Sequence, residues 1–163
     1  YPTLLEITGV RMKNQPPLDG VSLVSLIDGT MTARPRPMMF WKYPEGGIAT
    51  PSAKLMGDLL RAQQAGKPLP DDAQLCLDAA DVRKQYPEDV FPGHAAMLDW
   101  PWKLHRIAGR GGAPRLEFYN LADDPDEKRN AADDEPARTA AMKPELEKWQ
   151  LSVVRSLNGA DYH

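Results

Sequence analysis

The sequence predicts an α+β domain in which a small antiparallel sheet of about four strands is covered by a long C-terminal helix. Short apolar runs recur at residues 38–41, 94–100, 102–107 and 115–119, and proline or glycine separates them. Apolar residues then repeat at steps of three and four over residues 142–157, which is typical of one helix face. That face needs a sheet to cover it. The 163 residues, 42% hydrophobic and 26% charged, are typical of one globular domain.

The N-terminal part of the sequence predicts two short helices joined by turns. Residues 1–10 form an amphipathic pattern that Gly9 ends, since glycine accepts the left-handed conformation that closes many helices. The turn-rich linker 14–20 follows, and the apolar run 21–27 predicts a second short helix. The alternating arginines and prolines of residues 34–37 keep the chain extended before the first strand, because a residue before proline disfavours the helical region.

Residues 48–93 are predicted to form a helical excursion between two strands. Within them, residues 51–65 have apolar positions at helical spacing, and Gly66 follows as a C-terminal stop. A second short helix fits residues 71–85. Because proline and glycine punctuate the whole stretch, we expect it to be the most variable part of the fold.

The last three strands predict a meander that leads into the C-terminal helix. Pro101 separates the first two strands, and the acidic turn Asp124-Pro125-Asp126 ends the third. We expect the helix to span residues 134–158, with either a kink at Pro144 or a proper start near it, because an interior proline removes a hydrogen bond. The apolar face of this helix comprises Met142, Leu146, Trp149, Val153 and Leu157.

Charge and composition exclude several classes of function. The formal net charge of −3 argues against a nucleic-acid surface, which needs a concentrated basic face. No window reaches the ~20 apolar residues that span a bilayer, so we expect no membrane segment. The single cysteine, Cys76, allows no disulfide within the chain, and its leucine neighbours favour a packed thiol.

Several motifs, in a fixed order, make this sequence resemble the sulfatase family. The sequence carries them at residues 1–7, 18–23, 34–35, 102–104 and 116–132, followed by Leu146 and Trp149 in the final helix and by residues 159–162. The most informative is the run 116–132, in which a strand with two aromatics enters the acidic turn that ends at Asn130. The resemblance covers nearly the whole chain except the excursion 48–93.

The resemblance implies that residues 1–163 are the smaller C-terminal domain of a sulfatase-like hydrolase of the alkaline phosphatase superfamily. Residues 1–33 would be the end of the catalytic domain and the link from it. The parent would hydrolyse sulfate esters, of sulfated glycans in particular, with a formylglycine nucleophile and a calcium ion, and would be exported. The catalytic domain, joined in the same chain, would be the partner of this domain.

The sequence itself lacks that catalytic machinery. In the family, the formylglycine arises from a cysteine or serine that is followed by proline two positions on and arginine four positions on. Cys76 is followed by Leu77-Asp78-Ala79-Ala80, and no serine of the chain fits the pattern. We therefore predict no catalytic residue and no cofactor in this chain, and we expect the chain alone to be inactive.

Histidines and carboxylates offer one candidate site residue. The acidic groups at 71–72, 123–127 and 133–135 lack the pattern of a calcium loop and are interpreted as turns or helix starts, so we predict no metal ligands. His94 begins a strand where the excursion returns, a place where loops in this family can border the substrate pocket, so His94 is the candidate for the pocket rim. His105 is interpreted as a sheet residue, and His163 is terminal.

Two alternatives remain open from the sequence. The parent could be a phosphate or phosphonate ester hydrolase of the same superfamily. The four tryptophans could instead form a sugar-stacking platform of a carbohydrate-binding or interaction module, although core packing explains large aromatics on short strands better. In isolation, the chain would expose the apolar surface of residues 1–10, so we also expect self-association.

Overall fold

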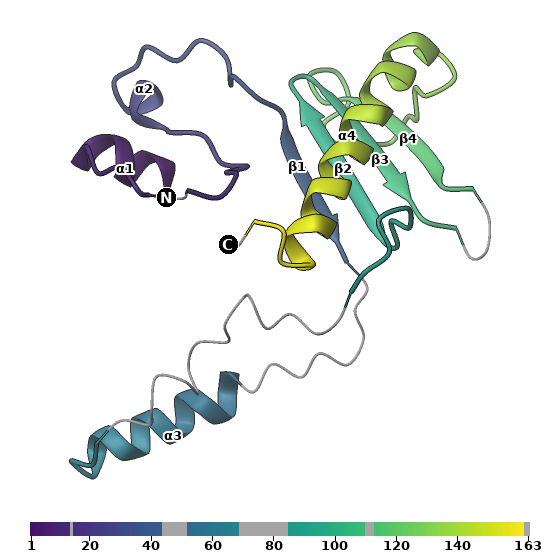
Figure 1. Cartoon of the computed structure of the whole chain (residues 1–163). Helices are drawn as coiled ribbons and strands as arrows, with labels where there is room; N and C mark the ends of the chain where they lie inside the picture. The colour runs from purple at the N-terminus through teal and green to yellow at the C-terminus, as the bar shows by residue number, and fades with distance from the viewer. Residues whose placement is uncertain (14, 44–51, 69–84, 110–112, 162–163) are drawn as a thin grey trace.

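The computed structural model of the chain describes residues 1–13, 15–43, 52–68, 85–109 and 113–161. Figure 1 shows four antiparallel strands and one long C-terminal helix with shorter helices before them, which confirms the α+β class. In chain order the elements are α1 (Pro2–Thr8), α2 (Val24–Ile27), β1 (Met38–Lys42), α3 (Ser52–Gln64), β2 (His94–Asp99), β3 (Trp102–Ile107), β4 (Arg115–Asn120) and α4 (Pro136–Leu157).

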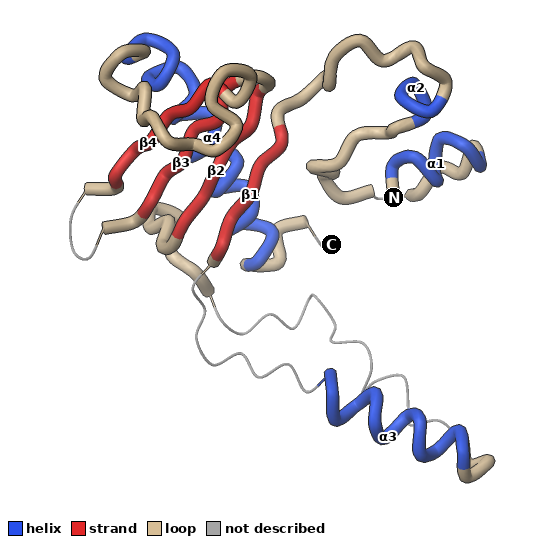
Figure 2. The backbone as a smooth tube through the Cα atoms, turned by 180° about the vertical axis from the view of Figure 1, so that it is seen from behind, coloured by secondary structure: helices blue, strands red, loops and turns tan. Residues whose placement is uncertain are grey.

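The sheet is a meander in which each strand pairs antiparallel with the next, in the order β1-β2-β3-β4. Helix α4 runs across one face of this sheet in both Figure 1 and Figure 2. No helix of the described residues covers the opposite face (Figure 2). Side chains alternate between the faces of a strand, so every second residue of the sheet belongs to this open face.

The core lies between the sheet and α4. Met97, Leu104 and Phe118 are register partners on three neighbouring strands, so they form one row on the helix face. Leu146 of α4 packs in the same cluster, and it is 0% exposed, as are Leu104 and Phe118. Trp102 stacks on Phe118 with ring centroids 5.0 Å apart and closes the end of the row. This packing explains why the apolar strand runs need the helix.

Helix α4 turns to the sheet a face that only partly matches the predicted one. Its buried residues are Thr139, Met142, Leu146, Gln150 and Val154, whereas Leu157 is 40% exposed. The predicted stripe is right at Met142, at Leu146 and at the partly buried Trp149, but beyond Trp149 the buried positions are Gln150 and Val154 and not Val153 and Leu157. The helix spans Pro136–Leu157, close to the predicted residues 134–158, and it does not start near Pro144, the other possibility that the sequence left open. Pro136 is at the first helical position, where a backbone N–H would have no partner within the helix, and the helix continues through the exposed Pro144.

The N-terminal segment packs locally. Helix α1 ends at Gly9, which has a left-handed φ of 67°, as predicted. Helix α2 is limited to Val24–Ile27, shorter than the predicted run 21–27. The Thr3 hydroxyl accepts a hydrogen bond from the Leu23 amide at 3.1 Å and so joins the two helices. No residue of α1 is buried.

The excursion between β1 and β2 is described only in part. Helix α3 spans Ser52–Gln64 and ends before Gly66, in agreement with the prediction for residues 51–65. The second predicted helix, Cys76 and the acidic pair at 71–72 lie in residues 69–84, outside the described residues. Within the described part of the chain, no helix has the length and hydropathy that a membrane span requires.

Candidate functional site on the open face of the sheet

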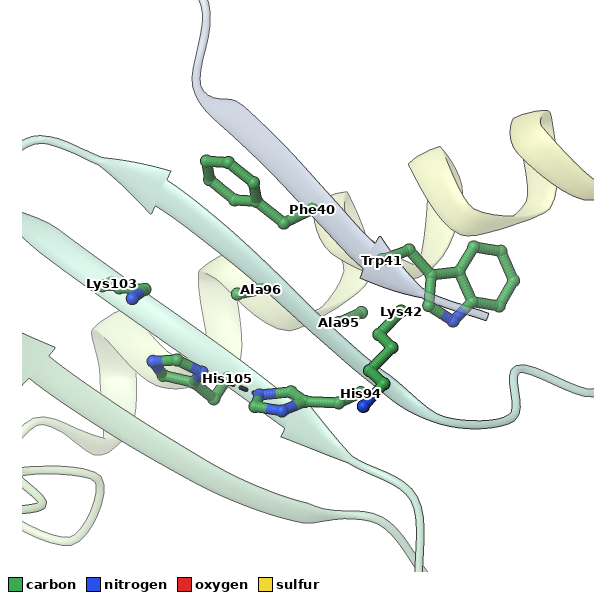
Figure 3. Close-up of a pocket in the computed structure, with 8 residues that line it drawn as sticks. All are labelled: Phe40, Trp41, Lys42, His94, Ala95, Ala96, Lys103 and His105. Carbon is green, nitrogen blue, oxygen red and sulfur yellow. Dashed lines mark hydrogen bonds between the residues drawn. The ribbon is translucent and has the colours of Figure 1, made fainter. Parts of the chain in front are cut away.

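The open face of the sheet carries a hollow of about 430 Å³ next to its two histidines. Phe40 and Lys42 come to it from β1, His94 and Ala96 from β2, and Lys103 and His105 from β3. Figure 3 shows His94 and His105 turned toward each other across two strands, with Lys42 beside His94. The sheet register explains this grouping, since Lys42 is the partner of His94 and Ala96 is the partner of His105.

The two imidazole rings form a direct hydrogen bond. His94 Nε2 and His105 Nδ1 lie 2.8 Å apart, so one ring donates and the other accepts. The environments of the rings differ, because His94 is exposed and His105 is only 8% exposed. Tyr119 closes the far side of His105, with its ring edge-on and the centroids 5.7 Å apart. His105 is therefore fixed within the sheet, as predicted, and it holds His94 at the surface of the hollow.

Glu127 supplies the negative charge behind this pair. Its Oε2 lies 2.9 Å from His105 Nε2, and its Oε1 accepts a hydrogen bond from Lys103 Nζ at 2.5 Å. The Glu127 oxygen lies off the direction of the His105 ring N–H, so the contact is a Coulombic one and not an aligned hydrogen bond. Lys103, His105 and Glu127 are all less than one-third exposed, which strengthens their electrostatic interaction.

The acidic turn after β4 places Glu127 against the sheet. The Asp124 carboxylate accepts hydrogen bonds from the backbone amides of Lys128 at 3.0 Å and Arg129 at 2.9 Å. These two hydrogen bonds lower the pKa of Asp124 below its usual value. At the end of the turn, the Asn130 side-chain oxygen accepts the Phe118 amide at 2.9 Å and so ties the turn back to β4. The predicted acidic turn is present. It also places the Glu127 carboxylate next to Lys103 of β3, which the sequence did not indicate.

Burial and neighbouring charges set the protonation of the network. Burial lowers the pKa of His105 below 6.5, and the Lys103 charge lowers it further, while Glu127 opposes both effects. Burial by itself would raise the pKa of Glu127, but the Lys103 hydrogen bond and the charge of His105 outweigh it and lower the pKa. Burial also raises the pKa of Tyr119, as does its hydrogen bond to Glu117. At neutral pH the network therefore contains a neutral His105 beside an ionised Glu127.

The arrangement can bind an anionic group. The exposed His94 and the ammonium group of Lys42 face the hollow, and Phe40 adds an apolar wall. No group of three His, Cys, Asp or Glu side chains with the spacing of a metal site occurs among the described residues. The described residues therefore hold no such cluster for a calcium ion, and Cys76 lies outside them.

The structure separates the four tryptophans into two kinds. Trp41, Trp102 and Trp149 are partly buried against the core, as predicted, and Trp41 Nε1 donates a hydrogen bond to the Pro92 carbonyl at 2.7 Å. Trp100 is 70% exposed, so the expectation of core packing is wrong for this residue. It sits in the turn between β2 and β3, and a turn position points outward from the sheet. Glu127 and Trp100 are functional candidates that the sequence did not single out, since it assigned Glu127 to a turn and Trp100 to the core.

Comparison with known proteins finds similarity to solved structures but no family match. No protein-family model and no curated protein matches this sequence. The chain is similar to the crystal structure of a phosphonate monoester hydrolase of Agrobacterium radiobacter, with 21% sequence identity and a TM-score of 0.42. The match covers 93% of this chain and 23% of that enzyme, so the chain spans less than a quarter of its length.

Proposed function

We propose that this chain is the C-terminal domain of a sulfatase-like hydrolase of the alkaline phosphatase superfamily. The parent hydrolyses sulfate esters, those of sulfated glycans in particular. This domain supports the catalytic domain and presents His94 at the rim of the substrate pocket. One observation carries the proposal: Lys103 and Glu127, from two separate motifs of the sulfatase resemblance, pair directly beside the two histidines.

The pairing matters because the two motifs are distant in sequence. Lys103 belongs to Trp102-Lys103-Leu104 and Glu127 to the acidic turn, 24 residues later. A resemblance due to chance composition gives no reason for its residues to meet in space. Here the turn is fixed by Asp124 and Asn130, and its carboxylate is delivered to the open face. The motifs are therefore parts of one structural unit.

The role of His94 follows from its exposure and its support. His105 and Glu127 hold the His94 ring from behind, and Lys42 adds a positive charge beside it. Such a group can donate a hydrogen bond to a sulfate oxygen or to a sugar hydroxyl of a bound substrate. The formylglycine and the calcium ion would come from the catalytic domain.

Helix α1 provides the surface for the catalytic domain. Tyr1, Leu4, Ile7 and Val10 are each more than half exposed, which is unusual for large apolar side chains at helical spacing. We infer that the catalytic domain, in the same chain, covers this surface. Docking there would bury apolar area and fix the link through residues 14–33.

The test compares this chain with the full-length reading frame that contains it. Both are assayed with a generic aryl sulfate and with an aryl phosphonate monoester, in the presence of calcium. We expect the longer protein to hydrolyse the sulfate and this chain to hydrolyse neither. Activity of this chain alone would refute the proposal, and a preference of the longer protein for the phosphonate would favour the alternative of a phosphonate hydrolase.

The role of His94 is tested in the longer protein with His94→Ala. We expect kcat/KM for the sulfate ester to fall by tenfold or more, and the thermal stability to fall only slightly, because His94 is exposed although His105 loses a hydrogen-bond partner. Lys128→Ala is the matched control, since the side chain of Lys128 is 77% exposed and pairs only with Asp126 among the described residues. Equal kcat/KM values for wild type, His94→Ala and the control would exclude His94 from the pocket.

A further inference from the structure

A second hollow lies at the opposite end of the sheet from the histidines. Strand β2 begins at His94 and ends at Asp99, so the turn that follows is about 17 Å from His94 along the strand. Trp100 occupies this turn and is 70% exposed. The Pro101 carbonyl accepts a hydrogen bond from the Leu121 amide at 2.9 Å, which fixes the backbone of the turn. A large indole is thus held outward on a supported hairpin.

Charged groups of both signs surround this indole. A hollow of about 310 Å³ is lined by Trp100 and Asp99 together with Arg34 and Arg36 from the segment before β1. Within the described residues, none of Arg34, Arg36 and Asp99 forms an ion pair, and the Nε of Arg34 is buried without a hydrogen-bond partner. Arg34 lines the hollow and has no ion-pair partner among the described residues, so its guanidinium charge can bind an anionic group of a ligand there.

Arg36 places the segment that carries Arg34. Its guanidinium donates hydrogen bonds to the Leu18 carbonyl at 3.0 Å and to the Gly20 carbonyl at 2.6 Å. Arg36 is therefore committed to the preceding linker, while Arg34 keeps its donors. The hollow combines one uncommitted cation, one uncommitted carboxylate and one exposed aromatic face.

We propose that this hollow binds one ring of an anionic saccharide. The apolar C–H face of the sugar packs on the Trp100 indole, the Asp99 carboxylate accepts hydrogen bonds from hydroxyls, and Arg34 binds a sulfate or carboxylate substituent. A simple inorganic anion would leave the indole and Asp99 unused. A neutral sugar would leave Arg34 unused. An anionic sugar engages all three groups.

The size of the hollow limits the ligand to a small unit. Binding sites for small molecules run from about 300 to 1,000 Å³, and about 310 Å³ is at the lower end of that range. One sugar ring therefore occupies the site, and a longer glycan extends from it into solvent. The site would hold a glycan chain at a position separate from the histidine hollow, and it belongs to this chain whatever reaction the parent performs.

The experiment uses the full 163-residue chain and three probes. These are a heparin-derived tetrasaccharide, the same tetrasaccharide without its sulfate groups, and sodium sulfate, each titrated while the indole N–H signals are followed by NMR. We expect the sulfated tetrasaccharide to shift the Trp100 signal, the desulfated form to bind at least fivefold more weakly, and sulfate alone to cause no shift of that signal. A shift with sulfate alone of equal size, or no shift with any probe, would overturn the proposal.

Variants assign the binding to the named groups. Because the Trp100 variants lack the indole signal, binding by all variants is measured by isothermal titration calorimetry. We expect Trp100→Ala and Arg34→Gln each to weaken binding of the sulfated tetrasaccharide at least tenfold, and Trp100→Phe to retain most of it. The matched controls are Tyr1→Ala and Arg129→Gln, which remove another exposed aromatic and another exposed arginine. Unchanged binding by Trp100→Ala, or equal losses in the controls, would refute the site. Far-UV circular dichroism of each variant confirms that the fold is kept.

Discussion

Replacing Leu146 by alanine is the most direct test of how α4 and the sheet hold each other. Leu146 is 0% exposed and packs in the cluster that contains Met97, Leu104 and Phe118. The substitution removes three carbons, which at about 0.8 kcal/mol each corresponds to about 2.4 kcal/mol of lost burial. The cavity that remains adds to this cost, so the free energy of unfolding should fall by about 3–5 kcal/mol.

The assay is urea unfolding of the chain at low concentration, followed by tryptophan fluorescence, with Leu157→Ala as the matched control. Leu157 is in the same helix but is 40% exposed, so its replacement should cost less than about 1 kcal/mol. This control also tests the corrected helix face, since the sequence pattern places both leucines on the buried stripe. Similar losses for the two variants would show that α4 does not pack on the sheet in this orientation.

Three further predictions concern the acidic turn, the histidines and α1. Burial lowers the pKa of His105 below 6.5, so as the pH drops the unfolded chain protonates this histidine before the folded chain does. The free energy of unfolding should therefore fall as the pH drops through 6.5. His105→Gln should flatten this dependence in urea titrations. Asn130→Ala leaves the Phe118 and Ala132 amides without their acceptor and should cost about 1–3 kcal/mol, with faster hydrogen exchange at Phe118, whereas Asn130→Asp keeps an acceptor and should cost less. The exposed apolar face of α1 should make the isolated chain associate as its concentration rises, and a sedimentation profile of pure monomer over a hundredfold range would contradict this.

The strands and helices could be predicted from the sequence because their signals are local. Each strand is a short apolar run with proline or glycine at its ends, and α3 and α4 repeat with the helical period. The face of α4 could not be predicted in full, because a hydrophobic pattern ignores a buried amide such as Gln150. The bounds of α4 agree with the predicted 134–158, but the sequence could not decide between them and a start near Pro144, because only the packed structure shows that Pro144 is on the exposed side.

Of the residues of the site, the sequence predicted only His94, because its place along the chain was the only usable signal. His94 could be chosen because it begins a strand after a long excursion, and the structure places it at the histidine hollow. Its support could not be predicted, because Lys103 and Glu127 are 24 residues apart and meet only after the turn folds. Trp100 was misjudged since aromatic residues near strands are usually buried, and the turn position reverses that rule.

The backbone conformation of Glu127 indicates that its side chain has a role beyond forming the turn. Its φ of 55° is left-handed, a conformation that costs a non-glycine residue roughly 1–2 kcal/mol. A glycine at this position would turn the chain without that strain. The hydrogen bonds of the turn offset part of this strain, and the carboxylate adds its contacts with Lys103 and His105. The turn is therefore built around the delivery of a charge to β3, which links the most informative motif of the sequence to the histidines of the open face.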